Sequence, residues 1–146
     1  MKSYAGTSFL VSLYVPDAHS AAASAAMKQA RGEVMITAFG EVELLNAIQL
    51  RVFRGELTSA QARSAARAFQ DDLCNGVFAL RPITVATIES AKRLAARHTH
   101  SLGVRTLDLL HVSAALVLEA EALYSFDLNQ RRLAKSAGVL PRPKAV

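Results

Sequence analysis

Cysteine is almost absent from this chain, with Cys74 the only one among 146 residues. A single cysteine cannot form an intrachain disulfide, and it cannot supply a cysteine-based zinc site. Both absences fit a reducing compartment. We therefore expect a cytoplasmic protein that uses no sulfur ligands for any metal it binds.

Long apolar runs are also missing. No stretch reaches the roughly 20 residues that a membrane-spanning helix needs, and the short apolar run near the start is broken by Pro16 and Asp17. That run also lacks the small-residue cleavage pattern of a signal peptide. The expectation is a protein that is neither exported nor in contact with a membrane.

Three common motifs of nucleotide-binding and hydrolytic enzymes do not occur: a Walker loop, a G-x-G-x-x-G fingerprint and a nucleophile elbow. There is no internal repeat, low-complexity segment or long linker. The tripeptide at residues 6–8 (GTS) has the composition to offer backbone N–H groups to a phosphate. It keeps one alternative open, an unrelated α/β enzyme that binds phosphate.

The composition that is present indicates one folded domain over residues 1–146. Hydrophobic residues make up 51% and charged residues 20%, a balance far from that of disordered chains. Lys and Arg number 17 against 12 Asp and Glu, which gives a net charge of +5. A surplus of this sign favours polyanionic partners such as nucleic acid.

Strand-like and helix-like hydrophobic patterns alternate along the chain. Strands are predicted at residues 3–5, 33–36, 77–80 and 123–126, with a weaker one near Val139, and helices at 18–31, 43–53, 58–72, 85–98, 106–119 and 127–138. Such alternation predicts an α/β fold with a mostly parallel sheet of about five strands and helices on both faces. Residues 141–146 are expected to be a frayed tail.

Three acidic residues fall where ligands bind in such folds, at the carboxyl edge of the sheet. They are Glu43, Asp108 and Asp127. Each also has a structural explanation: Glu43 as a partner of Arg54 or a helix cap, Asp108 as a complement to a helix dipole, and Asp127 as an N-cap. Three converging carboxylates repel one another unless divalent cations neutralise them, and oxygen ligands favour Mg²⁺ or Mn²⁺ over zinc.

Histidine adds one candidate to this set. His111 lies three residues after Asp108 and therefore on nearly the same side of its helix. Two interpretations stay open for it, a residue that orients a carboxylate and a satisfied core histidine. His98 and His100 lie near a predicted helix end, where they complement the helix dipole.

Four segments, taken in their order along the chain, form a recognisable set of motifs: residues 4–11 (YAGTSFLV), 43–48 (ELLNAI), 106–115 (TLDLLHVSAA) and 125–138 (SFDLNQRRLAKSAG). Together they resemble the motifs of PIN-domain ribonucleases, particularly the VapC-type toxins of toxin-antitoxin pairs. The resemblance implies a Mg²⁺- or Mn²⁺-dependent endoribonuclease that cleaves RNA, binds a cognate antitoxin and forms a homodimer.

The resemblance also implies roles for individual residues. Glu43, Asp108 and Asp127 match the catalytic and metal-ligand positions, and the hydroxyl residues Thr7 and Ser8 follow the first strand as in the family. His111 matches a common family residue. The remaining set consists of basic residues expected to guide the RNA backbone: Arg54, Arg105, Arg131 and Arg132.

Gly6 departs from the family pattern, which has Asp at this position. Two explanations stay open, a natural relative with impaired activity and a variant from which the carboxylate was removed because the active toxin harms its host. The competing function is a non-catalytic module that binds RNA or an antitoxin. Because Ala5 and Thr7 continue a run that reads as a strand entering a helix, we expect Gly6 to have ordinary extended dihedrals.

Overall fold

The computed structural model describes all residues 1–146 and contains one five-stranded sheet. All pairings are parallel, and the strand order is β3-β2-β1-β4-β5. The strands are β1 (Lys2–Ala5), β2 (Glu33–Thr37), β3 (Ala79–Arg81), β4 (Ala122–Tyr124) and β5 (Leu140–Arg142). The predicted α/β fold with a five-stranded parallel sheet is therefore confirmed.

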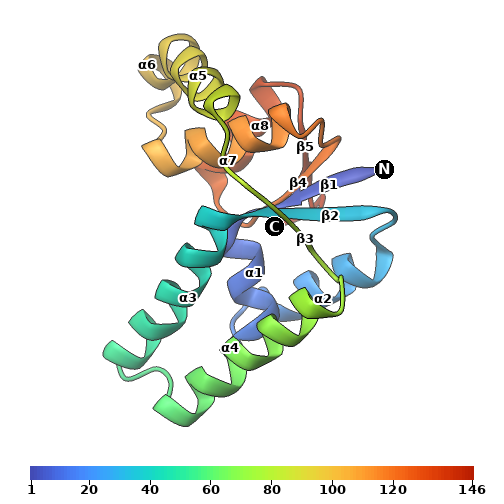
Figure 1. Ribbon diagram of the computed structural model, residues 1–146. Coiled ribbons are helices and arrows are strands. Elements are labelled where there is room, and N and C mark those ends of the chain that lie inside the picture. The colour runs from blue at the N-terminus through green and yellow to red at the C-terminus, as the bar shows by residue number, and fades with distance from the viewer.

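Helices cover both faces of this sheet, as Figure 1 shows. Below the sheet in that view lie α1 (Thr7–Tyr14), α2 (Ser20–Gln29), α3 (Ala38–Phe53) and α4 (Ser59–Cys74). Above it lie α5 (Val85–Leu94), α6 (His100–Leu102), α7 (Thr106–Val117) and α8 (Leu128–Ser136), with a π-helical turn at Ala95–Thr99 joining α5 to α6. None of the helices has the length and apolar character needed to span a bilayer.

The alternation of side chains along the strands divides the core in two. Ala5, Val34 and Ile36 belong to a cluster of 17 buried residues that packs against α1 to α4. Their neighbours Tyr4 and Met35 point the other way, into a cluster of 13 buried residues under α5, α7 and α8. Burial on both faces explains why the strands read as short, nearly continuous apolar runs.

The order of the strands places a topological switch point between β1 and β4. The chain builds β1, β2 and β3 outward in one direction and then returns to add β4 and β5 on the other side of β1. The connections from β1 and β4 therefore leave toward opposite faces of the sheet, and a crevice opens between them at the carboxyl ends of the strands.

Gly6 joins β1 to α1 at this crevice. Its φ of −80° and ψ of 166° are ordinary extended values, as expected from the sequence. Its N–H donates to the Tyr124 carbonyl at 2.9 Å, and its own carbonyl accepts from the N–H of Leu10 at 3.2 Å. The backbone at this position therefore does not need a glycine.

Helix α3 starts five residues earlier than predicted, at Ala38 and not at Glu43. Thr37 caps it, because the Thr37 hydroxyl accepts a hydrogen bond from the Gly40 N–H at 3.3 Å. Thr58 caps α4 as predicted: its hydroxyl accepts the Gln61 N–H, and its own N–H donates to the Gln61 Oε1. Glu43 consequently lies in the second turn of α3, beyond the reach of a capping role.

The expectation of a frayed tail is wrong for residues 141 and 142, which belong to β5. The Arg131 guanidinium holds this segment by donating to the carbonyls of Ser125, Arg142 and Pro143, at 2.8, 3.0 and 2.8 Å. Burial lowers the pKa of Arg131 from its ordinary value. Arg131 therefore stabilises the edge of the sheet. Its guanidinium, which was expected to guide RNA, is already hydrogen-bonded to three backbone carbonyls.

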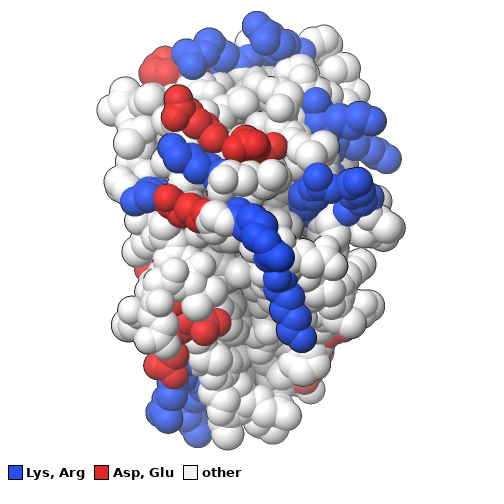
Figure 2. Space-filling view, turned by 90° about the vertical axis from the view of Figure 1, so that its right-hand side faces the viewer, with Lys and Arg blue, Asp and Glu red and all other residues white.

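Charge is mixed on the side of the molecule that carries the amino ends of β1 and β2. Figure 2 shows Lys and Arg together with Asp and Glu on this face, with most of the basic side chains in its upper half. The net positive charge of the chain is therefore not gathered into one purely basic patch on this face.

Candidate active site

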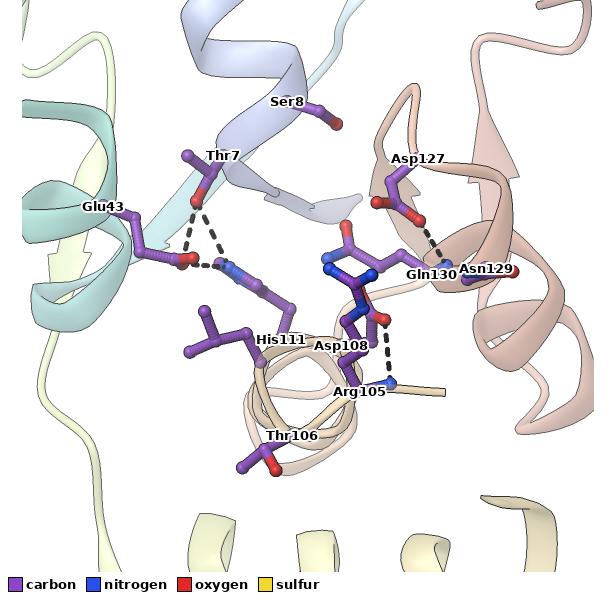
Figure 3. Close-up of a pocket in the computed structure, with 11 residues that line it drawn as sticks. Thr7, Ser8, Glu43, Arg105, Thr106, Asp108, His111, Asp127, Asn129 and Gln130 are labelled. Atoms are coloured by element: carbon purple, nitrogen blue, oxygen red, sulfur yellow. Dashed lines mark hydrogen bonds and ion pairs between the residues drawn. The ribbon is translucent and has the colours of Figure 1, made fainter. Parts of the chain in front are cut away.

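A polar hollow of about 630 Å³ opens at the carboxyl ends of β1 and β4 (Figure 3). It is formed by the first turns of α1, α7 and α8 together with one side of α3. Leu107 is the only hydrophobic residue among the eleven that line it. The other ten are Thr7, Ser8, Glu43, Arg105, Thr106, Asp108, His111, Asp127, Asn129 and Gln130. The structure thus brings the predicted acids, hydroxyl residues and histidine together.

Glu43 lies on one wall of the hollow and is held by two side chains. Its Oε1 lies 2.5 Å from the His111 Nε2 and accepts a hydrogen bond from the Thr7 hydroxyl at 2.9 Å. Arg54, proposed above as its structural partner, makes no ion pair with it and is exposed. The pairing of Glu43 with Arg54 is therefore wrong, because the α3 helix directs Glu43 into the sheet crevice and toward α7.

A buried chain of hydrogen bonds continues from His111 into the core. The His111 Nδ1 lies 2.8 Å from the Tyr4 hydroxyl, which lies 2.9 Å from the Thr37 hydroxyl. Tyr4, Thr37 and His111 are each at most 1% exposed. A missing partner anywhere in this chain would leave a polar atom unpaired in the core.

One arrangement of protons satisfies every atom of the chain. The Thr37 hydroxyl accepts from the Gly40 N–H and donates to Tyr4, and the Tyr4 hydroxyl donates to the His111 Nδ1. His111 then carries its proton on Nε2 and donates it to Glu43. Burial raises the pKa of Tyr4 far above its usual value, so that its hydroxyl remains a donor. The chain fixes the direction of the Glu43 carboxylate.

Asp127 lies on the opposite wall, exposed at the start of α8. Its Oδ1 caps the helix by accepting the Gln130 N–H at 2.9 Å, so the N-cap prediction is confirmed. The Ser8 hydroxyl holds the preceding loop by accepting the Phe126 N–H at 2.9 Å, and the Ser125 hydroxyl accepts the Asp127 N–H at 3.1 Å. One carboxylate oxygen of Asp127 carries no protein hydrogen bond.

Asp108 lies between these walls at the start of α7 and is 8% exposed. Its Oδ2 accepts the backbone N–H of Arg105 at 3.2 Å. The pKa of Asp108 is raised from its ordinary value, first by burial and further by the charge of Asp127; the hydrogen bond from the Arg105 backbone partly opposes the shift. A nearby cation would relieve this cost.

The donor set fits a hard divalent cation, which the family resemblance implies. Carboxylates are the ligands that Mg²⁺ and Mn²⁺ prefer, and Mg²⁺ keeps several of its waters in most protein sites. No three acidic or histidine side chains lie close enough together to coordinate one ion directly. Asp108 and Asp127 are the two carboxylates close enough for the charge of one to raise the pKa of the other. Glu43 faces them across the hollow (Figure 3).

The remaining predicted arginines have different surroundings. Arg105 lines the hollow. Arg54 lines a neighbouring one that also contains Ser8 and Asp127. Arg132 is exposed on α8 and lines neither. Arg105 is the basic residue best placed to meet a phosphate in the hollow.

Sequence reasoning did not single out Tyr4, Thr37 or Gln130 as residues of the site, nor Thr106 and Asn129, which also line the hollow. Thr37 had a usable signal, since it is a polar residue directly after the second predicted strand. Gln130 lies three residues after the predicted N-cap Asp127, in the first turn of a helix that borders the crevice. Tyr4 gave no signal, because a tyrosine within an apolar strand looks like an ordinary core residue.

Tyr4→Phe tests the buried chain of hydrogen bonds. The substitution removes the donor to the His111 Nδ1 and leaves that atom and the Thr37 hydroxyl short of a partner. We expect the free energy of unfolding, measured by urea denaturation, to fall by about 1 to 3 kcal/mol. Tyr124→Phe is the control, another buried strand tyrosine whose hydroxyl lies outside this chain. Equal losses for the two variants would contradict the interpretation.

Asp108→Asn tests how much the buried charge of Asp108 destabilises the fold. The melting temperature is measured in the presence of a chelator. Because the pKa of Asp108 is raised in the folded chain, its contribution to stability is present below the ordinary value of 3.8 and lost as the pH rises through the folded pKa. At neutral pH, Asp108→Asn should therefore melt at a higher temperature than the unchanged chain. The difference should shrink as the pH falls toward 3.8.

The matched control for Asp108→Asn is Asp71→Asn, which removes the same charge from an exposed position on α4. Its melting temperature should follow that of the unchanged chain across the pH range. A lower melting temperature for Asp108→Asn at neutral pH would mean that the hydrogen bond from Arg105 outweighs desolvation.

Solved structures with this architecture include toxins of toxin-antitoxin systems. VapC20 of Mycobacterium tuberculosis, a toxin that cleaves the sarcin-ricin loop, is similar with a TM-score of 0.73 and 20% identity, over 97% of this chain and 99% of its own. VapBC2 from Rickettsia felis, bound to a DNA fragment from its promoter, is similar with a TM-score of 0.68 and 15% identity, over 97% of this chain and 98% of its own. PAE2754 from Pyrobaculum aerophilum has a TM-score of 0.67 and 17% identity, over 97% of this chain and 83% of its own.

At these identities the structural likeness establishes a shared fold. A comparison with curated protein sequences found no match. The PIN domain family, however, matches the sequence over residues 4–136. That range includes β4, the carboxyl end of β1 and all three acidic residues of the hollow. The chain belongs to the PIN-domain family.

Proposed function

We propose that this chain is a Mg²⁺- or Mn²⁺-dependent endoribonuclease, the toxin of a toxin-antitoxin pair, whose activity is reduced by Gly6. One observation carries the proposal: Glu43, Asp108 and Asp127 line the same hollow at the switch point of a PIN-domain sheet. The similarity to VapC20, a toxin that cleaves the sarcin-ricin loop, supports RNA as the substrate class. Such a substrate places the protein in the cytoplasm.

Each residue has a defined part in this proposal. A bound divalent cation supplies an activated water and neutralises charge that develops on the phosphate. Asp108 and Asp127 would hold the cation, and Glu43, oriented by His111 and Thr7, faces them across the hollow. Ser8 fixes the loop before Asp127, and Arg105 binds the phosphate of the RNA backbone.

A cognate antitoxin and a second copy of the chain are the protein partners in this proposal. VapBC2 and a toxin-antitoxin complex from Klebsiella pneumoniae, the latter at 11% identity and a TM-score of 0.61, share the fold. Helix α3 exposes Val42 and Phe53, which are 66% and 86% accessible. Exposed apolar residues on one helix are typical of surfaces that contact other proteins.

A second candidate function follows from Gly6, which removes one anionic ligand from the set the family resemblance implies. A PIN-domain protein without cleavage activity would bind RNA or an antitoxin through the same surface. The two candidates differ in one measurable property, since only the nuclease requires a cation in the hollow.

Calorimetric titration with Mn²⁺ tests the metal site. We expect weak binding, because one carboxylate is missing, and Asp108→Asn should weaken it at least tenfold further. Asp71→Asn, which changes the same charge far from the hollow, should leave the affinity unaltered. Binding that Asp108→Asn does not change would put the cation elsewhere and favour the non-catalytic module.

Gly6→Asp tests the activity itself. The extended dihedrals of residue 6 suit Asp once the end of the Gln130 side chain moves aside, and the added carboxylate supplies the missing anionic ligand. Mn²⁺-dependent cleavage of a broad RNA pool, including tRNA and ribosomal fragments, should rise by orders of magnitude. Gly6→Ala is the control, since it adds a side chain without charge. A folded Gly6→Asp variant that binds Mn²⁺ and cuts no RNA would refute the ribonuclease proposal.

A further inference from the structure

Gln130 occupies the space that Gly6 leaves beside the acidic residues. A Cβ atom placed on Gly6 would lie 2.5 Å from the Gln130 Oε1 and 3.5 Å from its Cδ. The nearest backbone atom, the Tyr124 carbonyl oxygen, is 3.4 Å away, which is ordinary contact. The end of one flexible side chain therefore fills the place where a side chain of residue 6 would begin.

The Gln130 amide oxygen is buried and has no partner. The residue is 5% exposed, and Oε1 accepts no hydrogen bond. Buried amide oxygens are nearly always paired, because an unpaired acceptor loses its water without compensation. This unpaired oxygen beside a hollow lined by carboxylates is therefore available to bind a cation or to accept a hydrogen bond.

The Gln130 side chain lies close enough to Asp108 to lower the pKa of that carboxyl group. Its amide oxygen lies toward residue 6. Figure 3 shows this side chain reaching from α8 into the hollow, between Asp108 and Thr7.

We propose that Gln130 replaces the absent carboxylate of residue 6 as an oxygen ligand of the divalent cation. The inference rests on the proposed function, since it assumes a cation between Asp108 and Asp127. Side-chain amide oxygens coordinate hard cations, although they bring no charge. The site then retains an oxygen ligand on the β1 side while carrying one negative charge fewer than a site with four carboxylates.

The two positions should therefore be coupled. A full side chain at residue 6 requires the Gln130 amide to move away, so Gly6→Asp and Gln130 compete for the same volume. Substitutions that share a volume and a ligand are not additive. Gly6→Asp should raise the Mn²⁺ affinity more in a Gln130→Ala background than in the unchanged chain.

Titration of Mn²⁺ by calorimetry tests the ligand role with three variants. Gln130→Leu keeps the volume and removes the oxygen, and should weaken binding about tenfold or more. Gln130→Glu keeps the length and adds a charge, and should tighten it. Gln49→Leu, the same change at an exposed position on α3, should have no effect. Gln130→Met provides a second apolar side chain of similar length if Gln130→Leu does not fold.

Asp108→Asn separates this inference from the proposed function. If Asp108→Asn weakens Mn²⁺ binding and neither Gln130→Leu nor Gln130→Met does, Gln130 only fills space, and the inference is overturned while the metal site stands. If none of the three substitutions changes the affinity, the cation does not bind in the hollow, and the proposed function fails with it. Melting curves in chelator show in each case that the variant is folded.

Discussion

The parallel pairing of β1 with β4 is the constraint on which the candidate site depends. Ser3, Tyr4 and Ala5 pair with Ala122, Leu123 and Tyr124, and the Gly6 N–H extends the ladder by one bond. Because the two strands end at the same level and their connections leave toward opposite faces, α1 and α8 begin beside each other. Residues that are separated by more than a hundred positions in the chain, such as Ser8 and Ser125, therefore share a hydrogen bond.

The arrangement of the carboxylates reflects the repulsion between them. Glu43 is kept apart on its own wall, where His111 and Thr7 supply donors that stabilise its charge. Asp108 and Asp127 remain close enough to repel each other. Burial and the charge of Asp127 together raise the pKa of Asp108. Hydrogen bonds from the core and from helix N-termini offset part of this repulsion.

The sequence predicted the fold class and the convergence of the acidic residues, because both follow from local patterns repeated along the chain. Strand and helix periods are local, and the carboxyl-edge rule needs only the residues that follow each strand. The buried hydrogen bonds behind the Glu43–His111 pair could not be predicted in this way. They join residues of β1, β2 and α7, and only the packed fold brings Tyr4, Thr37 and His111 into one hydrogen-bonded chain.

The same distinction explains why the domain forms with glycine at residue 6, where the family resemblance implies an Asp. Both backbone groups of Gly6 are bonded, to Tyr124 and to Leu10, and neither bond involves a side chain. The strand and the α1 helix therefore form with any residue that accepts extended dihedrals. What the missing side chain alters is the charge of the hollow and the volume beside Gln130. In this family member, then, the fold is set by the backbone at the end of β1, and the chemistry by the side chains that face it.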